Sequence, residues 1–288
     1  DISPKIAATQ LPSYITDYIH FHNDAINSIK AGTEQAKNFR YLVYSCGKKD
    51  DRCSGTAQRQ RGILAMMLVA IITNRVLLID YAKPVRLETV LQPNLIQWNA
   101  YETLKGIDKL PNTFIYNRNT NQYVLDEPGV FMEGGDGNKK ESAQVTKILT
   151  AGPPSLANLL ASEASMDFFK KYNIRPIMEV RETVLYKRLF ATLYKPSELL
   201  KTEFTQARKE LGLQLNSKYI GMHVRYGNEG SAKAVVRYSD KGVAAFIEVG
   251  KALKEENMKG FADEDIPFVV VADEQGVKDR LLAMDPLV

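Results

Sequence analysis

A polar pair at the end of an apolar strand pattern is the first place in this sequence where residue types and spacing could do chemistry. The segment reads Tyr219-Ile220-Gly221-Met222-His223-Val224-Arg225. Side chains alternate across a strand, so we expect His223 and Arg225 on one face. In an open parallel sheet, ligands bind in the crevice beyond the carboxyl ends of the strands. The planar guanidinium of Arg225 is suited to a phosphate there; the alternative is an arginine that extends into a surface ion pair.

A second polar cluster begins a predicted helix, in Gln58-Arg59-Gln60-Arg61-Gly62-Ile63. Arg59 and Arg61 add cations to the positive end of the helix macrodipole, which opposes local stability. Such a start is typical of a helix whose N-terminus faces an anion or a carboxylate. The alternative is a pair of surface contacts with Asp50 and Asp51, which would stabilise little. Both interpretations stay open.

Glu229 follows Arg225 in a Gly-Asn-Glu-Gly loop. Its carboxylate could take a proton from an attacking hydroxyl as a general base. The alternative is a solvated loop glutamate.

Cys46 and Cys53 are the two cysteines, and they close a short loop. In an oxidising compartment they could form a disulfide; two free thiols are the alternative. Two cysteines with no nearby histidine cannot supply four zinc ligands, and the three histidines have no metal-ligand spacing, so we expect no metal site.

The elements that must position these residues alternate between strand and helix. Residues 41–45 and 76–80 read as strands around a helix whose buried face includes Ile63 and Leu68, which predicts a βαβ unit. The remaining predictions are a surface helix within 1–38, short strands at 113–116 and 123–125, a turn-rich loop at 133–138, a mostly helical stretch over 155–212, a helix over 240–256, a strand over 268–273 and a helix from Glu274. This alternation of strands and helices predicts an α/β protein.

Length, composition and net charge limit the classes of protein to which this sequence can belong. The 288 residues favour two domains, and 44% hydrophobic with 25% charged residues is typical of a globular protein. A net charge of +4 without an arginine-rich run argues against nucleic acid as a partner. The longest apolar run, 63–72, is too short to cross a bilayer. The abrupt ends at Asp1 and Val288 lead us to expect a fragment.

Five islands of this sequence, one of them residues 87–93 with 96–98, resemble GDP-fucose-dependent fucosyltransferases of the α1,6-, xyloglucan and protein O-fucosyltransferase lines. Residues 58–63 resemble the Gly-Asp-Arg-x-x-Gly-Ile start, and residues 73–80 the Asn-Arg-strand-Asp segment. Residues 221–225 resemble the GDP-binding His-x-Arg motif, and residues 268–273 the next strand, which ends in an aspartate. Only such islands match between 41 and 282.

The resemblance implies a GT-B architecture: two Rossmann-like domains that face each other across a cleft. Residues 1–175 would form the acceptor-side domain, 176–215 a helical linker region, and 216–288 a nucleotide-sugar-binding domain that we expect to be truncated. It implies metal-independent, inverting transfer of fucose from GDP-fucose to a glycan or protein hydroxyl, in the Golgi or ER lumen.

By position, Arg225 would bind the β-phosphate of the donor, His223 and Asp273 would lie near the nucleotide, and Arg59 would line the cleft beside Gln58 and Arg61. Glu229 is the nearest candidate for the base.

Three departures weaken the match. Gln58 replaces the motif aspartate, Tyr226 replaces a frequent second arginine, and no room remains before Val288 for the family's last donor-binding segment. The alternatives are a GT-B enzyme that uses another sugar nucleotide, and an inactive pseudoenzyme that binds a glycan or nucleotide.

Overall fold

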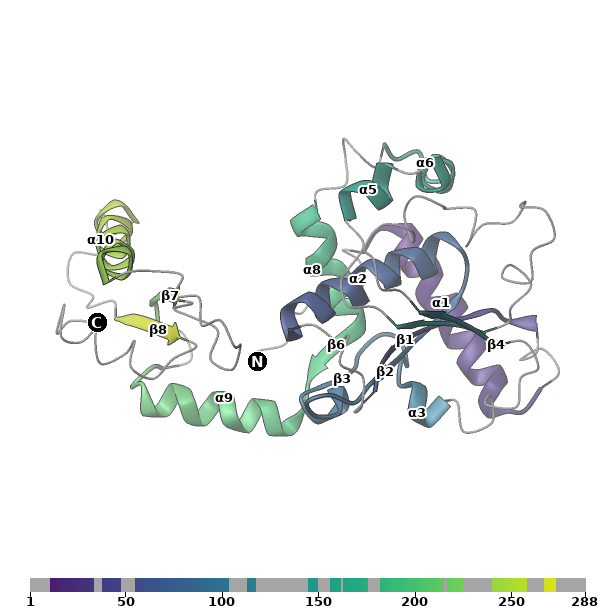
Figure 1. Ribbon diagram of the computed structural model, residues 1–288, viewed down its shortest axis with the longest axis horizontal. Coiled ribbons are helices and arrows are strands. Elements are labelled where there is room, and N and C mark those ends of the chain that lie inside the picture. The colour runs from purple at the N-terminus through teal and green to yellow at the C-terminus, as the bar shows by residue number, and fades with distance from the viewer. Residues whose placement is uncertain are drawn as a thin grey trace. The chain divides into compact units, whose positions relative to one another are not determined.

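The computed structural model divides into two compact units, Asp1–Phe204 and Thr205–Val288, and each is described by itself (Figure 1). The described residues are 11–33, 38–47, 55–103, 113–117, 145–149, 156–161, 163–175, 182–214, 217–224, 240–257 and 267–272. Helices and strands alternate, as the α/β class predicts.

A four-stranded sheet organises the first unit. Its strands are β1 (Tyr41–Cys46), β2 (Val76–Tyr81), β4 (Thr113–Asn117) and β5 (Val145–Leu149), in the order β2-β1-β5-β4. Every pairing is parallel. The helix between β1 and β2 is α2 (Thr56–Ile72), so the predicted βαβ unit is confirmed, as is the strand predicted at 113–116. The pattern did not predict β5.

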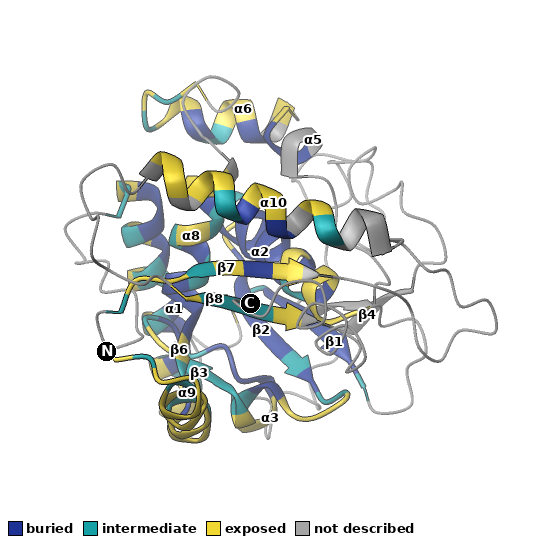
Figure 2. Cartoon of the chain, turned by 90° about the vertical axis from the view of Figure 1, so that its left-hand side faces the viewer, coloured by how far each residue is buried: buried dark blue, intermediate teal, exposed yellow. Residues whose placement is uncertain are grey.

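Helices cover both faces of β1 and β2, which explains why these strands are apolar at successive positions. Leu42 and Tyr44 pack in one core cluster with residues of α2. Val43 packs in a second cluster with residues of α1 (Ser13–Lys30). Figure 2 shows α2 and β2 in the dark blue of buried residues.

The helix predicted near the N-terminus is confirmed as α1, and one face of it is part of the core. Tyr14, Ile15 and Tyr18 are buried. The Tyr18 hydroxyl donates to the Arg75 carbonyl at 3.0 Å and accepts from the Leu77 amide at 3.1 Å, so it bridges both groups at the start of β2. The tyrosines between the isoleucines widen the apolar face beyond what the isoleucine spacing alone indicates.

The stretch predicted as mostly helical contains α5 (Leu156–Ala161), α6 (Glu163–Lys170), α8 (Glu182–Leu193) and α9 (Glu198–Glu210). It also contains an unpredicted strand, β6 (Tyr194–Pro196), which pairs antiparallel with β3 (Leu91–Pro93). The remaining elements are η3 (Leu87–Thr89) and α3 (Ala100–Thr103). Core residues of α8 pack with α2, so α8 belongs to the first unit although it falls within the predicted linker.

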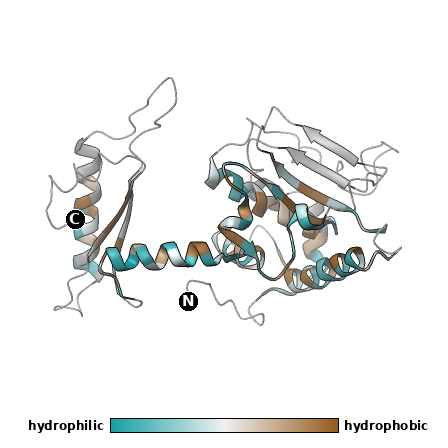
Figure 3. Ribbon diagram, turned by 90° about the horizontal axis from the view of Figure 1, so that it is seen from below, coloured by the Kyte–Doolittle hydropathy of each residue, from teal (hydrophilic) through white to brown (hydrophobic). Residues whose placement is uncertain are grey.

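The boundary between the units falls within α9, which has no buried residue. Figure 3 shows polar residues along most of this helix. Among the described residues, no helix has both the length and the apolar character needed to cross a membrane.

The second unit pairs β7 (Ile220–Val224) with β8 (Phe268–Ala272) in parallel, beside α10 (Asp240–Asn257). All three were predicted. A Cβ on Gly250 of α10 would lie 2.7 Å from a ring carbon of Phe268, so helix and strand approach too closely for a side chain at this position. The other predicted elements, 123–125, 133–138 and the helix from Glu274, lie outside the described residues.

β7, the predicted strand before the polar pair, is buried at alternate positions. Met222 is buried beside α10, whereas Gly221 and His223 are exposed. The strand is therefore half-buried, because α10 covers the face that carries Met222.

Candidate active site

The carboxyl ends of β1 and β2 meet at one edge of the first unit's sheet. Ser45 pairs with Asp80, and Cys46 pairs with Tyr81. Because side chains alternate, Ser45 and Asp80 project on one face and Tyr81 on the other. The Ser45 hydroxyl donates to Asp80 Oδ2 at 3.0 Å. This edge thus presents a partly exposed carboxylate whose orientation is set by a buried serine.

Arg59 connects the start of α2 to the segment that follows β2. Its side chain is buried, at 7% exposure. Nη1 donates to the Tyr81 hydroxyl at 3.0 Å and to the Lys83 carbonyl. The guanidinium carbon lies 5.1 Å from the centre of the Tyr81 ring, within cation–π range. Arg59 therefore has partners within its own chain, whereas Asp50 and Asp51, its predicted alternative partners, lie outside the described residues.

The other two residues predicted beside Arg59 lie in solvent. Gln58 and Arg61 are exposed on the first turns of α2. Between them, the Gln60 side-chain oxygen is buried and has no hydrogen-bond partner among the described residues. The three predicted residues share a helix end, but only Gln58 and Arg61 are available there to a ligand.

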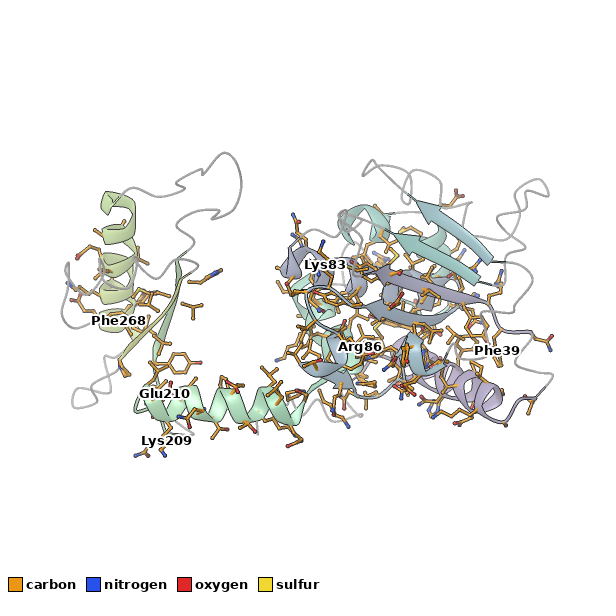
Figure 4. The ribbon with its side chains drawn as sticks, turned by 60° about the horizontal axis from the view of Figure 1, so that its bottom comes forward. Phe39, Lys83, Arg86, Lys209, Glu210 and Phe268 are labelled. Carbon is orange, nitrogen blue, oxygen red and sulfur yellow. The ribbon has the colours of Figure 1, made fainter. Side chains whose placement is uncertain are left out.

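The segment after β2 carries polar residues that were not among the predicted site residues. Arg86 Nη2 lies 3.0 Å from Glu88 Oε1, and its guanidinium carbon lies 4.3 Å from the centre of the Tyr101 ring. Figure 4 labels Lys83 and Arg86 on this segment. The available signal was their place soon after β2, the strand that carries Asp80.

Tyr194 is a buried tyrosine in the core of the first unit. Burial, with smaller effects from Tyr44 and Tyr81, raises the pKa of Tyr194 well above its usual value. Its hydroxyl has no hydrogen-bond partner among the described residues. The ring stacks edge-on against Trp98 at 5.6 Å, so Tyr194 serves the packing of this region as a neutral phenol.

Cys46, the last residue of β1, is fully buried and disulfide-bonded. Cys53, the only other cysteine of the sequence, lies outside the described residues. The Cys46 bond leaves no free cysteine in the described part of the chain.

In the second unit, the structure places one predicted donor residue. His223 is exposed on β7 and pairs with Val271 of β8. Arg225, Glu229 and Asp273 lie outside the described residues. Among the residues that the structure describes, no group of three histidine, cysteine or acidic side chains could hold a metal ion.

No family model matches this chain. No curated protein matches it either.

Among solved structures, a mutant of the fucosyltransferase FUT1 from Arabidopsis thaliana, in complex with GDP, superposes with a TM-score of 0.58 at 13% identity. The match covers 94% of this chain and 63% of that chain, so this chain spans less than two thirds of it. The Bradyrhizobium fucosyltransferase NodZ matches with a TM-score of 0.48 at 13% identity, over 86% of this chain and 77% of that one. The resemblance to fucosyltransferases is thus confirmed in the fold.

Proposed function

We propose that this chain is part of a GT-B glycosyltransferase that transfers fucose from GDP-fucose to a glycan or protein hydroxyl. The observation that carries the proposal is the fold shared with FUT1, a protein solved with GDP, over 94% of this chain. The exposed His223 on β7 supports a donor site on the second unit. The polar edge at the end of β2 supports an acceptor site on the first unit. In this proposal residues 1–175 form the acceptor-side domain, residues 176–215 form a linker region, and residues 216–288 bind the donor. We also propose that the enzyme works in the secretory pathway.

The proposed chemistry is an inverting displacement without a metal. The acceptor oxygen forms a bond to the sugar C1 while the bond from C1 to the diphosphate oxygen breaks, and GDP leaves. Arg225 stabilises the charge that develops on the diphosphate, because a fixed guanidinium is already oriented toward it. Glu229 takes the acceptor proton, and His223 and Asp273 contact the nucleotide.

Arg59 contributes to this site by positioning. Because its guanidinium is already bound to Tyr81 and Lys83, it holds the segment after β2 against α2. Gln58 and Arg61 are exposed at the same helix start, so we assign the contacts with a ligand there to these two residues.

A panel of nucleotides tests the proposal. Thermal unfolding of the full chain is measured with GDP, UDP, ADP and CMP, and hydrolysis of GDP-fucose follows for any nucleotide that binds. A ligand at about a hundredfold its Kd stabilises the native state by about 2.7 kcal/mol. Selective stabilisation by GDP with donor hydrolysis is the expected result. Stabilisation by UDP alone would overturn the donor assignment, and GDP binding without hydrolysis would indicate a pseudoenzyme.

A further inference from the structure

An exposed aromatic ring, a guanidinium and a carboxylate form one cluster after β2. Tyr101 of α3 is 55% exposed, and the Arg86 guanidinium lies over its ring at 4.3 Å. The Glu88 carboxylate holds Arg86 from its other side, with an oxygen at 3.0 Å. The side chains of Arg86 and Glu88 are 43% and 22% exposed.

Buried residues anchor the backbone that carries this cluster. Leu87, between Arg86 and Glu88, is 2% exposed, and Ala100, next to Tyr101, is 1% exposed. Each polar side chain therefore projects from backbone that a buried neighbour anchors. The hydrogen bond to Glu88, partly offset by burial, raises the pKa of Arg86.

Stability alone does not account for the arrangement. An ion pair as exposed as Arg86 and Glu88 stabilises a protein by about 0–1 kcal/mol. A half-exposed Tyr101 ring leaves apolar area in contact with water, which contributes nothing to stability. The Arg86 guanidinium stacks on this ring although it could be fully hydrated instead. An exposed ring with a donor stacked on it and an acceptor bonded to that donor offers both apolar and polar contacts to a ligand.

The chemistry of the cluster favours a neutral sugar. A hexopyranose has faces of C–H groups, which pack on an aromatic ring, and a rim of hydroxyls that both donate and accept. A guanidinium only donates and a carboxylate only accepts, so Arg86 and Glu88 together satisfy such hydroxyls. Their opposite charges cancel, which disfavours a phosphate. We propose that Tyr101, Arg86 and Glu88 bind a neutral hexopyranose ring of the acceptor.

The assignment of this sugar to the acceptor rests on the proposed function, but binding of the sugar itself can be measured independently of transfer activity. Saturation-transfer NMR on the full chain, with methyl β-D-galactopyranoside and methyl β-D-glucopyranoside as probes, reports binding directly. Galactose 1-phosphate serves as the anionic comparison. Three variants are compared with the wild type: Tyr101→Ala removes the ring, Tyr101→Phe keeps it, and Tyr219→Ala removes a tyrosine of similar exposure (50%) in the second unit.

We expect Tyr101→Ala to weaken binding of a methyl glycoside by about two- to tenfold, with Tyr101→Phe and Tyr219→Ala close to the wild type. Equal binding by Tyr101→Ala, or binding of the sugar phosphate alone, would overturn the proposal. GDP stabilisation is recorded in the same samples. A GDP response without saturation transfer refutes the sugar subsite only, whereas Tyr101-dependent sugar binding without a GDP response refutes the proposed donor only.

Discussion

At the scale of single residues, the cations of this chain differ in what surrounds them. Arg59 is buried against groups of its own chain, Arg61 is exposed in the same helix turn, and Arg86 stacks on an exposed ring. The same residue type thus serves packing, solvation and, we propose, recognition. Substitutions separate these roles.

Arg225 is the residue on which the proposed chemistry depends most. A lysine cannot reproduce two parallel hydrogen bonds to a diphosphate, because an ammonium lacks the planar fork. We expect Arg225→Ala to abolish transfer and weaken GDP binding, and Arg225→Lys to keep some GDP binding while most of the rate is lost. One charge-assisted hydrogen bond contributes about 1.5–3 kcal/mol, which corresponds to roughly tenfold or more. Calorimetric titration with GDP is the measurement, with circular dichroism as the folding control; wild-type affinity in folded Arg225→Ala would refute the role.

His22 makes stability depend on pH. Its side chain is fully buried and Nε2 lies 2.9 Å from the Leu77 carbonyl oxygen, while burial, partly offset by that bond, lowers the pKa to about 4. The unfolded chain, with a histidine pKa near 6.5, therefore binds the proton first as pH falls. We expect the free energy of unfolding to decrease from pH 6.5 to pH 4, by about 3 kcal/mol in total.

The test of His22 is urea unfolding at pH 7 and pH 4, followed by fluorescence of Trp98, the only tryptophan and a buried residue of the first unit. His22→Gln should show a smaller pH dependence than the wild type. His20→Gln, at an exposed position of the same helix, is the matched control and should retain the wild-type dependence. Equal slopes in all three proteins would contradict the assignment.

At the scale of elements, the contact between α2 and the segment after β2 is the one that the site depends on. Arg59→Ala removes two hydrogen bonds from a charged donor, worth about 1.5–3 kcal/mol each at most, and relieves a dipole penalty of about 0.3–1 kcal/mol. We expect a net loss of about 2–3 kcal/mol in the stability of the first unit, again by urea unfolding. Arg61→Ala relieves only the dipole term and should change stability by less than about 0.5 kcal/mol. Similar losses in both variants would contradict the bridging role.

The disulfide of Cys46 fixes the end of β1. If its partner is Cys53, the closed loop is short and the bond stabilises the native state by about 2–3 kcal/mol. We expect Cys53→Ala to cost about as much as Cys46→Ala combined with Cys53→Ala, because either removes the whole bond. Intact-mass measurement after alkylation, with and without reductant, checks the pairing. A neutral Cys53→Ala would refute it.

The sequence predicted elements whose signal is local and missed those that depend on distant partners. β1 and β2 are nearly continuous apolar runs and α2 is apolar over most of its length, so their positions follow from the local sequence. β6 lies in a stretch read as helical, and it is a strand because Leu91–Pro93 pairs with it. The same limit applies to the site. Arg59 donates a hydrogen bond to the Lys83 carbonyl, which is 24 residues away in the sequence. No local sequence pattern predicts such a contact.

At the scale of the whole molecule, we expect donor binding to be independent of metal ions. The proposed charge stabilisation relies on arginine, so GDP binding and transfer should be unchanged by EDTA. The measurement is thermal stabilisation by GDP, with and without EDTA and with Mn²⁺ added back. Loss in EDTA that Mn²⁺ restores would contradict the proposed mechanism and its fold assignment.

The order β2-β1-β5-β4 also has a consequence for synthesis on the ribosome. The β1–α2–β2 unit can pair as soon as residue 81 has emerged, but within the described sheet β4 pairs with β5 alone. β4 is synthesised before β5 (Val145–Leu149), so β4 has no partner strand until β5 has been synthesised. The edge of β1 that pairs with β5 stays open during the same interval. Unpaired strand edges are templates for association with other chains. The nascent chain is therefore most exposed to aggregation, and most in need of a chaperone, between the emergence of β4 and the emergence of β5.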